Sequence, residues 1–215
     1  MTIVDLLEVT ALLAAIGYLG FTARAPSVLR SVLKTASVAL LALAAGIAGA
    51  PFWLVAALGL CALGEYFLSR QGETSFMAGV GAFAAGHLAY VLLFLRQESR
   101  DLSRIWEIAG LGLTLGFIAL GIVMVRVLAP RAGELKIPVM GYIPIILGMG
   151  LAALSLTAEA LFWVLPAALA FVASDVVLAF ETFVLREDHW LRRYTPYVVW
   201  PLYWGAQAGF YLSFS

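Results

Sequence analysis

Eight runs of apolar residues follow one another along the chain, and each is close to the roughly 20 residues that a helix needs to cross a bilayer. Short polar or proline-containing stretches separate the runs. Nothing in them shows the alternation of a membrane barrel, so each run is expected to satisfy its backbone hydrogen bonds as a helix. The predicted helices span residues 3–22, 32–49, 51–69, 77–95, 105–128, 138–157, 160–182 and 195–214.

The composition agrees with a membrane location. Of the 215 residues 63% are hydrophobic and 12% are charged, against about 45–50% and 25% in ordinary soluble domains. A water-soluble fold of this size has too little interior for so much apolar surface. The fold class is therefore predicted as all-α, with residues 1–215 forming a single polytopic membrane domain of about eight transmembrane helices. A cytosolic enzyme, a secreted domain and a disordered chain are excluded.

The charge and the cysteine content restrict which partners and cofactors the protein can bind. Thirteen basic and thirteen acidic residues leave no net charge, which argues against binding to nucleic acid. Cys61, the single cysteine, allows no intramolecular disulfide and is interpreted as a small buried hydrophobe. Of the two histidines, His189 lies in a charged loop, so a zinc site of three nitrogen or sulfur ligands within the membrane is not available. We therefore expect no metal and no cofactor, although an all-carboxylate site stays open.

The basic residues predict an orientation in the membrane. Ten lie at the connections 1–2, 3–4, 5–6 and 7–8 or the helix ends beside them, and only three lie on the other side. By the positive-inside rule the first group faces the cytoplasm, so both termini are expected outside. In a bacterium this is the inner membrane. The first group consists of Arg24, Arg30, Lys34, Arg70, Arg126, Arg131, Lys136, Arg186, Arg192 and Arg193.

Two carboxylates inside the apolar runs are the first candidates for function, because each costs at least ~2.5 kcal/mol in hydrocarbon. Glu65 lies about five residues from the inner end of its run, roughly 7 Å deep. Asp175 lies at a similar or greater depth in the run 160–182. They either share a polar cavity open to the inner leaflet or are satisfied by arginines reaching in from the loops. The shared cavity is the favoured interpretation.

Four other polar side chains lie in further runs, and each has a structural alternative. Lys34 is also typical of an interfacial anchor, and Tyr142 of interfacial packing. His87 and Gln207 are also typical of hydrogen-bonded packing between helices. Together with the carboxylates they come from six different helices. That coincidence predicts one water-accessible cavity lined by both carboxylates, His87 and Gln207.

Short motifs extend this pattern over nearly the whole chain. The segment FMAGVGAFAAGHLAY carries Phe76, Gly79, Phe83, His87 and Tyr90 in a characteristic spacing. The pattern also includes Lys34 in the run 32–49, Glu65 in GEYFL, Tyr142 in VMGYIP, the pair Ser174 and Asp175, and Gln207 in YWGAQ. In these segments the chain resembles the YhhN-like family, the lysoplasmalogenases. One departure is Glu65, which stands where the family usually has aspartate and moves the carboxylate by about one methylene.

The resemblance implies an integral membrane hydrolase that cleaves the vinyl ether bond of lysoplasmalogens. The products are a fatty aldehyde and a glycerophospho-alcohol, either glycerophosphocholine or glycerophosphoethanolamine. The partner implied is a lysophospholipid substrate within the bilayer.

The chemistry of that reaction fits the candidate residues. An acid protonates the vinyl carbon distal to oxygen, and water traps the resulting oxocarbenium ion. Two carboxylates in unequal environments suit this chemistry, one as proton donor and one ionised, as in glycosidases. Glu65 and Asp175 are the expected catalytic pair, with the acid left undecided between them. The expected substrate-binding residues are His87, Tyr142 and Gln207 around the water and glycerol hydroxyl, and Lys34, with nearby Arg30, at the lipid phosphate.

Two other classes of function stay open. A transporter is expected to show repeats or helices broken at the membrane midplane, and only Pro144 and Pro166 offer such breaks. The second open class is a protein of the same fold that binds lipid but has no catalytic activity. A retinal receptor is disfavoured because neither Lys34 nor Lys136 lies in the last helix.

Overall fold

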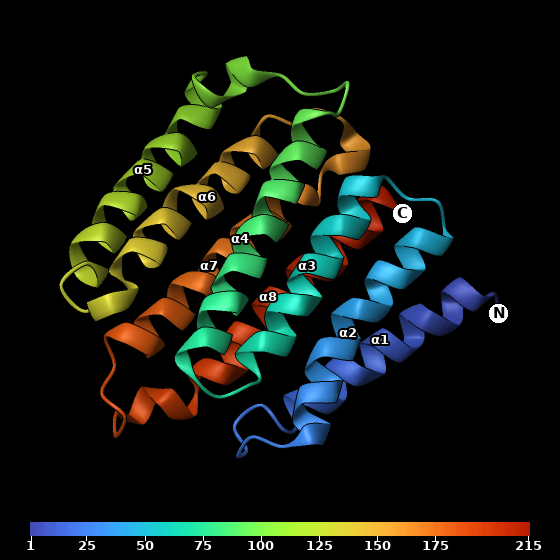
Figure 1. Cartoon of the computed structure of the whole chain (residues 1–215). Helices are drawn as coiled ribbons and strands as arrows, with labels where there is room; N and C mark the ends of the chain where they lie inside the picture. The colour runs from blue at the N-terminus through green and yellow to red at the C-terminus, as the bar shows by residue number, and fades with distance from the viewer.

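The structure, a computed structural model, describes all 215 residues and consists of α-helices joined by short connections (Figure 1). This confirms the predicted all-helical class of about eight helices. Five of them, α2, α4, α5, α6 and α7, are long and apolar enough to cross a membrane, and α3 is a shorter apolar helix. The helices are α1 (Ile3–Leu19), α2 (Val28–Ile47), α3 (Phe52–Leu68), α4 (Glu73–Leu95), α5 (Ile108–Leu128), α6 (Lys136–Leu154), α7 (Val164–Phe183) and α8 (Thr195–Phe214).

Several helix ends differ from the predicted bounds for local reasons. Helix α2 begins four residues early, because the Ser27 side chain accepts a hydrogen bond from the backbone N–H of Arg30 and caps it. Helix α4 also begins early, directly after Gly72, whose φ of +105° favours glycine. Helices α5 and α7 begin late because short 3₁₀ helices, Leu102–Ile105 and Glu159–Leu161, precede them. These ends depend on caps and turns rather than on apolarity.

Seven of the helices surround a common centre. Helices α1 to α4 pack in sequence order, α6 packs against α4, and α7 joins α6 to α8. Helix α8 closes the arrangement by contacting α1, α2 and α3. Helix α5 lies outside this ring at one edge, where it packs mainly against α6 (Figure 1). All seven central helices therefore contribute side chains to the same interior.

The interior is a continuous apolar core of 34 buried residues drawn from all eight helices. Aromatic rings fill the part on the α4, α7 and α8 side: the ring of Phe210 lies 4.4 Å from that of Tyr90 and 5.5 Å from that of Phe94. Such offset ring pairs add stability beyond their buried area.

Neither proline that was considered as a helix break interrupts its helix. Helix α6 runs continuously through Pro144. Helix α7 begins only two residues before Pro166, in a first turn where the missing N–H of proline is tolerated. The two breaks that a transporter reading would use are therefore absent.

Close packing of α3 on α4 generates the first prediction. A Cβ atom at Gly86 would lie 2.8 Å from Cys61 Sγ and 3.3 Å from the Ala57 carbonyl oxygen, whereas one at Gly81 on the same helix would meet nothing within 4 Å. Gly86→Ala is expected to lower the free energy of unfolding by roughly 1–3 kcal/mol through overpacking. Gly81→Ala, the matched control, is expected to be neutral or stabilising by up to about 1 kcal/mol. Thermal unfolding of both variants in detergent checks this, and equal melting temperatures would contradict the close contact.

Candidate active site

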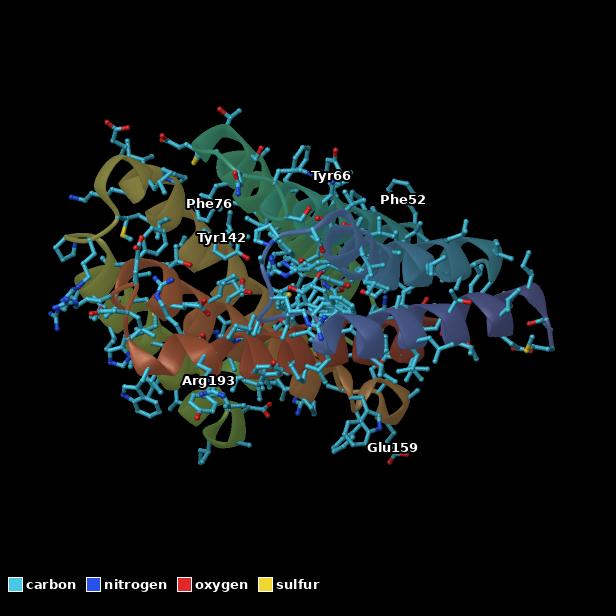
Figure 2. All side chains as sticks on the ribbon, turned by 90° about the horizontal axis from the view of Figure 1, so that it is seen from below. Phe52, Tyr66, Phe76, Tyr142, Glu159 and Arg193 are labelled. Atoms are coloured by element: carbon cyan, nitrogen blue, oxygen red, sulfur yellow. The ribbon has the colours of Figure 1, made fainter.

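A cavity of about 350 Å³ lies inside the bundle, toward the end where α3 and α7 finish and α2, α6 and α8 begin. Its ionisable and phenolic lining comes from several helices and includes Arg30, Lys34, Glu65, Tyr142 and Asp175. Phe76 and Tyr142, both labelled in Figure 2, belong to the lining, whereas Glu159 stands at the periphery of the molecule. The cavity thus gathers most of the polar side chains that the sequence places inside apolar runs.

Lys34 and Glu65 form an ion pair in the cavity wall. Lys34 Nζ lies 2.5 Å from Glu65 Oε2, and the two side chains are 19% and 4% exposed. Lys34 lies in the second turn of α2 and Glu65 in the last turn of α3, so the pair joins two adjacent helices near the same end. Each charge depends on the other, because a single buried charge without a partner is very costly.

Asp175 is held differently, by neutral hydroxyl groups. The Tyr142 hydroxyl donates to Oδ2 of Asp175 at 2.5 Å, and the Ser174 hydroxyl lies 3.4 Å from Oδ1. No lysine or arginine forms an ion pair with this carboxyl group. The two carboxyl groups of the cavity therefore differ in kind: Glu65 is paired with a cation, and Asp175 is hydrogen-bonded by phenol and hydroxyl.

His87 lies behind Asp175 rather than in the cavity wall. It is fully buried, and its Nδ1 lies 2.7 Å from the Phe83 carbonyl oxygen. A carbonyl oxygen only accepts, so Nδ1 carries the proton and, in a neutral ring, Nε2 is free to accept. Nε2 has no hydrogen-bond partner and lies 3.9 Å from Asp175 Oδ2. At this distance the two atoms are close neighbours without a hydrogen bond between them.

Gln207 is also buried away from the cavity. Its side-chain oxygen accepts a hydrogen bond from the Tyr90 hydroxyl at 2.5 Å, and its Nε2 has no partner. Neither Gln207 nor His87 belongs to the cavity lining. The prediction that both line the cavity with the carboxylates was wrong, because helix rotation turns them toward the core instead.

Two tyrosines line the cavity that the sequence did not single out. The ring of Tyr18 packs on Trp200 at 4.2 Å, and Lys34 Nζ lies 5.9 Å from its centroid. Tyr203 also lines the cavity, 5.8 Å from Trp200, and its buried hydroxyl has no hydrogen-bond partner. Aromatic residues are common in any membrane helix, so nothing in the local sequence distinguishes these two.

The cavity is amphipathic along its length. Its α1–α2–α3 side carries Arg30, Lys34 and Glu65, while helices α5, α6 and α7 contribute a broad apolar wall. Asp175 and Tyr142 lie among these apolar residues of α7 and α6. Members of the apolar wall include Leu120, Met124, Leu128, Val139, Ile143, Ile146, Leu147 and Ala179. Such a space suits an amphiphile that has a polar head and one hydrocarbon chain.

Metal binding has no geometric support in the structure. No group of three or more histidine, cysteine, aspartate or glutamate side chains lies close enough together to hold a metal ion.

These features define an α-helical integral membrane protein with an internal cavity that contains ionisable groups. The model of the YhhN family matches residues 29–214, which is most of the chain. The protein therefore belongs to the YhhN family, as the sequence motifs predicted. Comparisons with curated proteins and with solved structures find no significant match.

The ion pair of the cavity wall generates the second prediction. Lys34→Met and Glu65→Leu each leave one uncompensated charge and are expected to lower the free energy of unfolding by roughly 3–5 kcal/mol. The double variant removes both charges and is expected to recover most of that loss. Unfolding in sodium dodecyl sulfate measures all three variants.

A surface pair provides the control for this cycle. Arg186 and Asp188 are 83% and 74% exposed, so Asp188→Asn is expected to change the free energy of unfolding by no more than about 1 kcal/mol. If the double variant at the cavity is as unstable as the sum of its two single variants, the two charges are not coupled and the ion pair has no structural role.

Proposed function

We propose that this protein is an integral membrane hydrolase that cleaves the vinyl ether bond of lysoplasmalogens. The whole chain, residues 1–215, acts as one membrane domain, and the substrate enters the cavity from the bilayer. The products are a fatty aldehyde and glycerophosphocholine or glycerophosphoethanolamine. The observation that carries the proposal is a pair of carboxyl groups in different settings facing one amphipathic cavity.

The proposed reaction needs one acid, one water molecule and a place for positive charge. A proton adds to the vinyl carbon distal to oxygen, and the carbon bonded to oxygen becomes part of an oxocarbenium ion. Water attacks that carbon and loses a proton, which gives a hemiacetal. The hemiacetal breaks its bond to the glycerol oxygen, which leaves as an alcohol, and the aldehyde is released. The sum is the vinyl ether plus water giving aldehyde plus alcohol.

Asp175 is the proposed acid. Its carboxyl group has no cationic partner, and it lies among apolar residues of α7 where the neutral form is favoured. After Asp175 gives its proton to carbon, the Tyr142 hydroxyl at 2.5 Å and the Ser174 hydroxyl at 3.4 Å stabilise the carboxylate. The same carboxylate then takes a proton from the attacking water, so the acid is regenerated within one turnover.

Glu65 is the proposed ionised partner. Lys34 holds it in place and balances its charge while the site is empty. When the oxocarbenium ion forms, the carboxylate of Glu65 stabilises the new positive charge in surroundings where such interactions are stronger than in water. His87 and Gln207 act as positioning residues from behind the wall, since His87 Nε2 faces Asp175 and Gln207 holds Tyr90.

The activity of substituted proteins tests these roles, and this is the third prediction. Asp175→Asn and Glu65→Gln are each expected to lower turnover by roughly 100-fold or more, as for loss of a general acid or base. Tyr142→Phe, which removes one hydrogen bond to a charged group, is expected to lower it by roughly 10–100-fold. Glu65→Asp, which restores the usual family residue, is expected to retain or raise turnover. Aldehyde and glycerophosphoethanolamine are both measured from purified protein in detergent.

Two controls accompany these assays. Glu159→Gln alters an exposed carboxylate at the far end of the molecule and is expected to leave turnover unchanged. An alkyl-ether lysolipid has no double bond to protonate and is expected to give no product. If only Glu65→Asp hydrolyses the vinyl ether, wild type is a lipid binder without activity, and if wild type and Glu65→Asp both fail, the hydrolase proposal is wrong. If Glu65→Gln turns over as fast as wild type, the two-carboxylate chemistry is wrong.

The orientation in the membrane is part of the proposal and supplies the fourth prediction. Ten basic residues lie at the connections beside the cavity, and by the positive-inside rule they favour a cytoplasmic location for that end. Reporter fusions after Phe76, Lys136 and Asp188 are expected to report a cytoplasmic location. A fusion at the C-terminus, which lies at the opposite end of α8, is expected to report the outside. An external signal from any of the first three would overturn this orientation.

A further inference from the structure

Arg30 is a cation of the cavity wall for which the proposed reaction has no use. It lies in the first turn of α2, one turn before Lys34, and lines the cavity. Its terminal Nη2 donates to the Thr22 carbonyl oxygen at 3.0 Å and to the Tyr18 hydroxyl at 3.5 Å. Its Nε is buried and has no hydrogen-bond partner. The guanidinium group is therefore held in place, and at least one of its hydrogen-bond donors, Nε, has no acceptor.

The charges around Arg30 do not balance. Lys34, one helical turn away, is already paired with Glu65, and Arg30 forms no ion pair with any carboxylate. Glu181 also lines the cavity, but it belongs to α7 and lies beyond ion-pair distance of Arg30. This part of the wall thus carries one excess positive charge in partly buried surroundings. Such a charge is stabilised by an anion brought in with a ligand.

The planar shape of the Arg30 guanidinium group favours phosphate as the anion. Guanidinium presents its donors as a flat fork that matches the oxygen atoms of a phosphate, and such charge-assisted hydrogen bonds are among the stronger ones in proteins. The Tyr18 ring, 5.8 Å from the Arg30 guanidinium carbon, and the Thr22 carbonyl fix the fork and reduce the freedom it would lose on binding.

We propose that Arg30 binds the phosphate of the lysophospholipid. This inference rests on the proposed function and deepens it, because it orients the substrate in the cavity. The phosphate lies at Arg30, and the glycerol passes Lys34 and Glu65, roughly 6 Å further along α2. The hydrocarbon chain then lies against the apolar wall of α5, α6 and α7, with the vinyl ether beside Asp175. The sequence suggested Lys34 with nearby Arg30 at the phosphate; the inference gives this role to Arg30, because Lys34 is paired with Glu65.

Binding of two unreactive lipids tests this inference without any hydrolysis, and this is the fifth prediction. The probes are 1-O-hexadecyl-glycerophosphocholine and 1-O-hexadecylglycerol, which share the alkyl ether chain and differ by the phosphocholine group. Calorimetric titration in maltoside detergent is expected to show that wild type prefers the phospholipid by roughly tenfold or more. Arg30→Gln is expected to reduce that preference to near one. Arg30→Lys keeps the charge without the fork and is expected to fall between them.

Arg24→Gln is the matched control, because Arg24 lies in the α1–α2 connection shortly before Arg30 but is exposed and stacks on Phe21. Its lipid preference is expected to equal that of wild type.

Excess sodium phosphate is expected not to displace the phospholipid, whereas displacement at similar affinity would assign the site to a soluble anion and overturn the lipid inference. Equal binding of both probes by wild type, or an unchanged preference in folded Arg30→Gln or Arg30→Lys, would also overturn it. Hydrolysis without a preference for the phospholipid would contradict this inference alone. A preference for the phospholipid without hydrolysis would contradict the proposed function alone.

Discussion

The ion pair between Lys34 and Glu65 is the interaction on which the rest of the cavity depends. Two charges in a membrane bundle are tolerated because they are 2.5 Å apart and come from adjacent helices, α2 and α3. Once these charges neutralise each other, the neighbouring Arg30 remains without a counter-ion and Asp175 remains without a cation. Both consequences give the cavity its chemistry: one end attracts an anion, and the other holds a carboxyl group among hydroxyl groups and apolar side chains.

This division fits the proposed use of one cavity for both binding and reaction. A lysolipid has an anionic head, a short glycerol and a single hydrocarbon chain, and the lining contains a cation at Arg30, carboxyl groups at Glu65 and Asp175, and an apolar wall. In the proposed complex the vinyl ether lies beside Asp175 and the head group at Arg30. Helix α5 lies outside the ring of seven and supplies part of the apolar wall.

Much of the fold was predictable because apolar run length and helix length are physically linked in a membrane. The range predicted for α8, residues 195–214, equals the observed Thr195–Phe214. The starts of α2 and α4 were missed because their first turns are polar and depend on capping by Ser27 and on Gly72. The gathering of polar residues was predictable from the cost of charge in hydrocarbon. The residues that face the cavity were not predictable, because they depend on helix rotation and packing order. Gln207 lies in the core, and Tyr18 belongs to the lining although nothing in the local sequence indicates it.

The central claim is that a carboxylic acid of the cavity protonates a vinyl carbon. Hydrolysis in heavy water tests it most directly, with the released aldehyde reduced at once to an alcohol and analysed by mass spectrometry. The account predicts one deuterium on the carbon next to the former carbonyl carbon, and loss of this labelled product in Asp175→Asn. Aldehyde released without deuterium at that carbon would contradict protonation on carbon and with it the proposed mechanism.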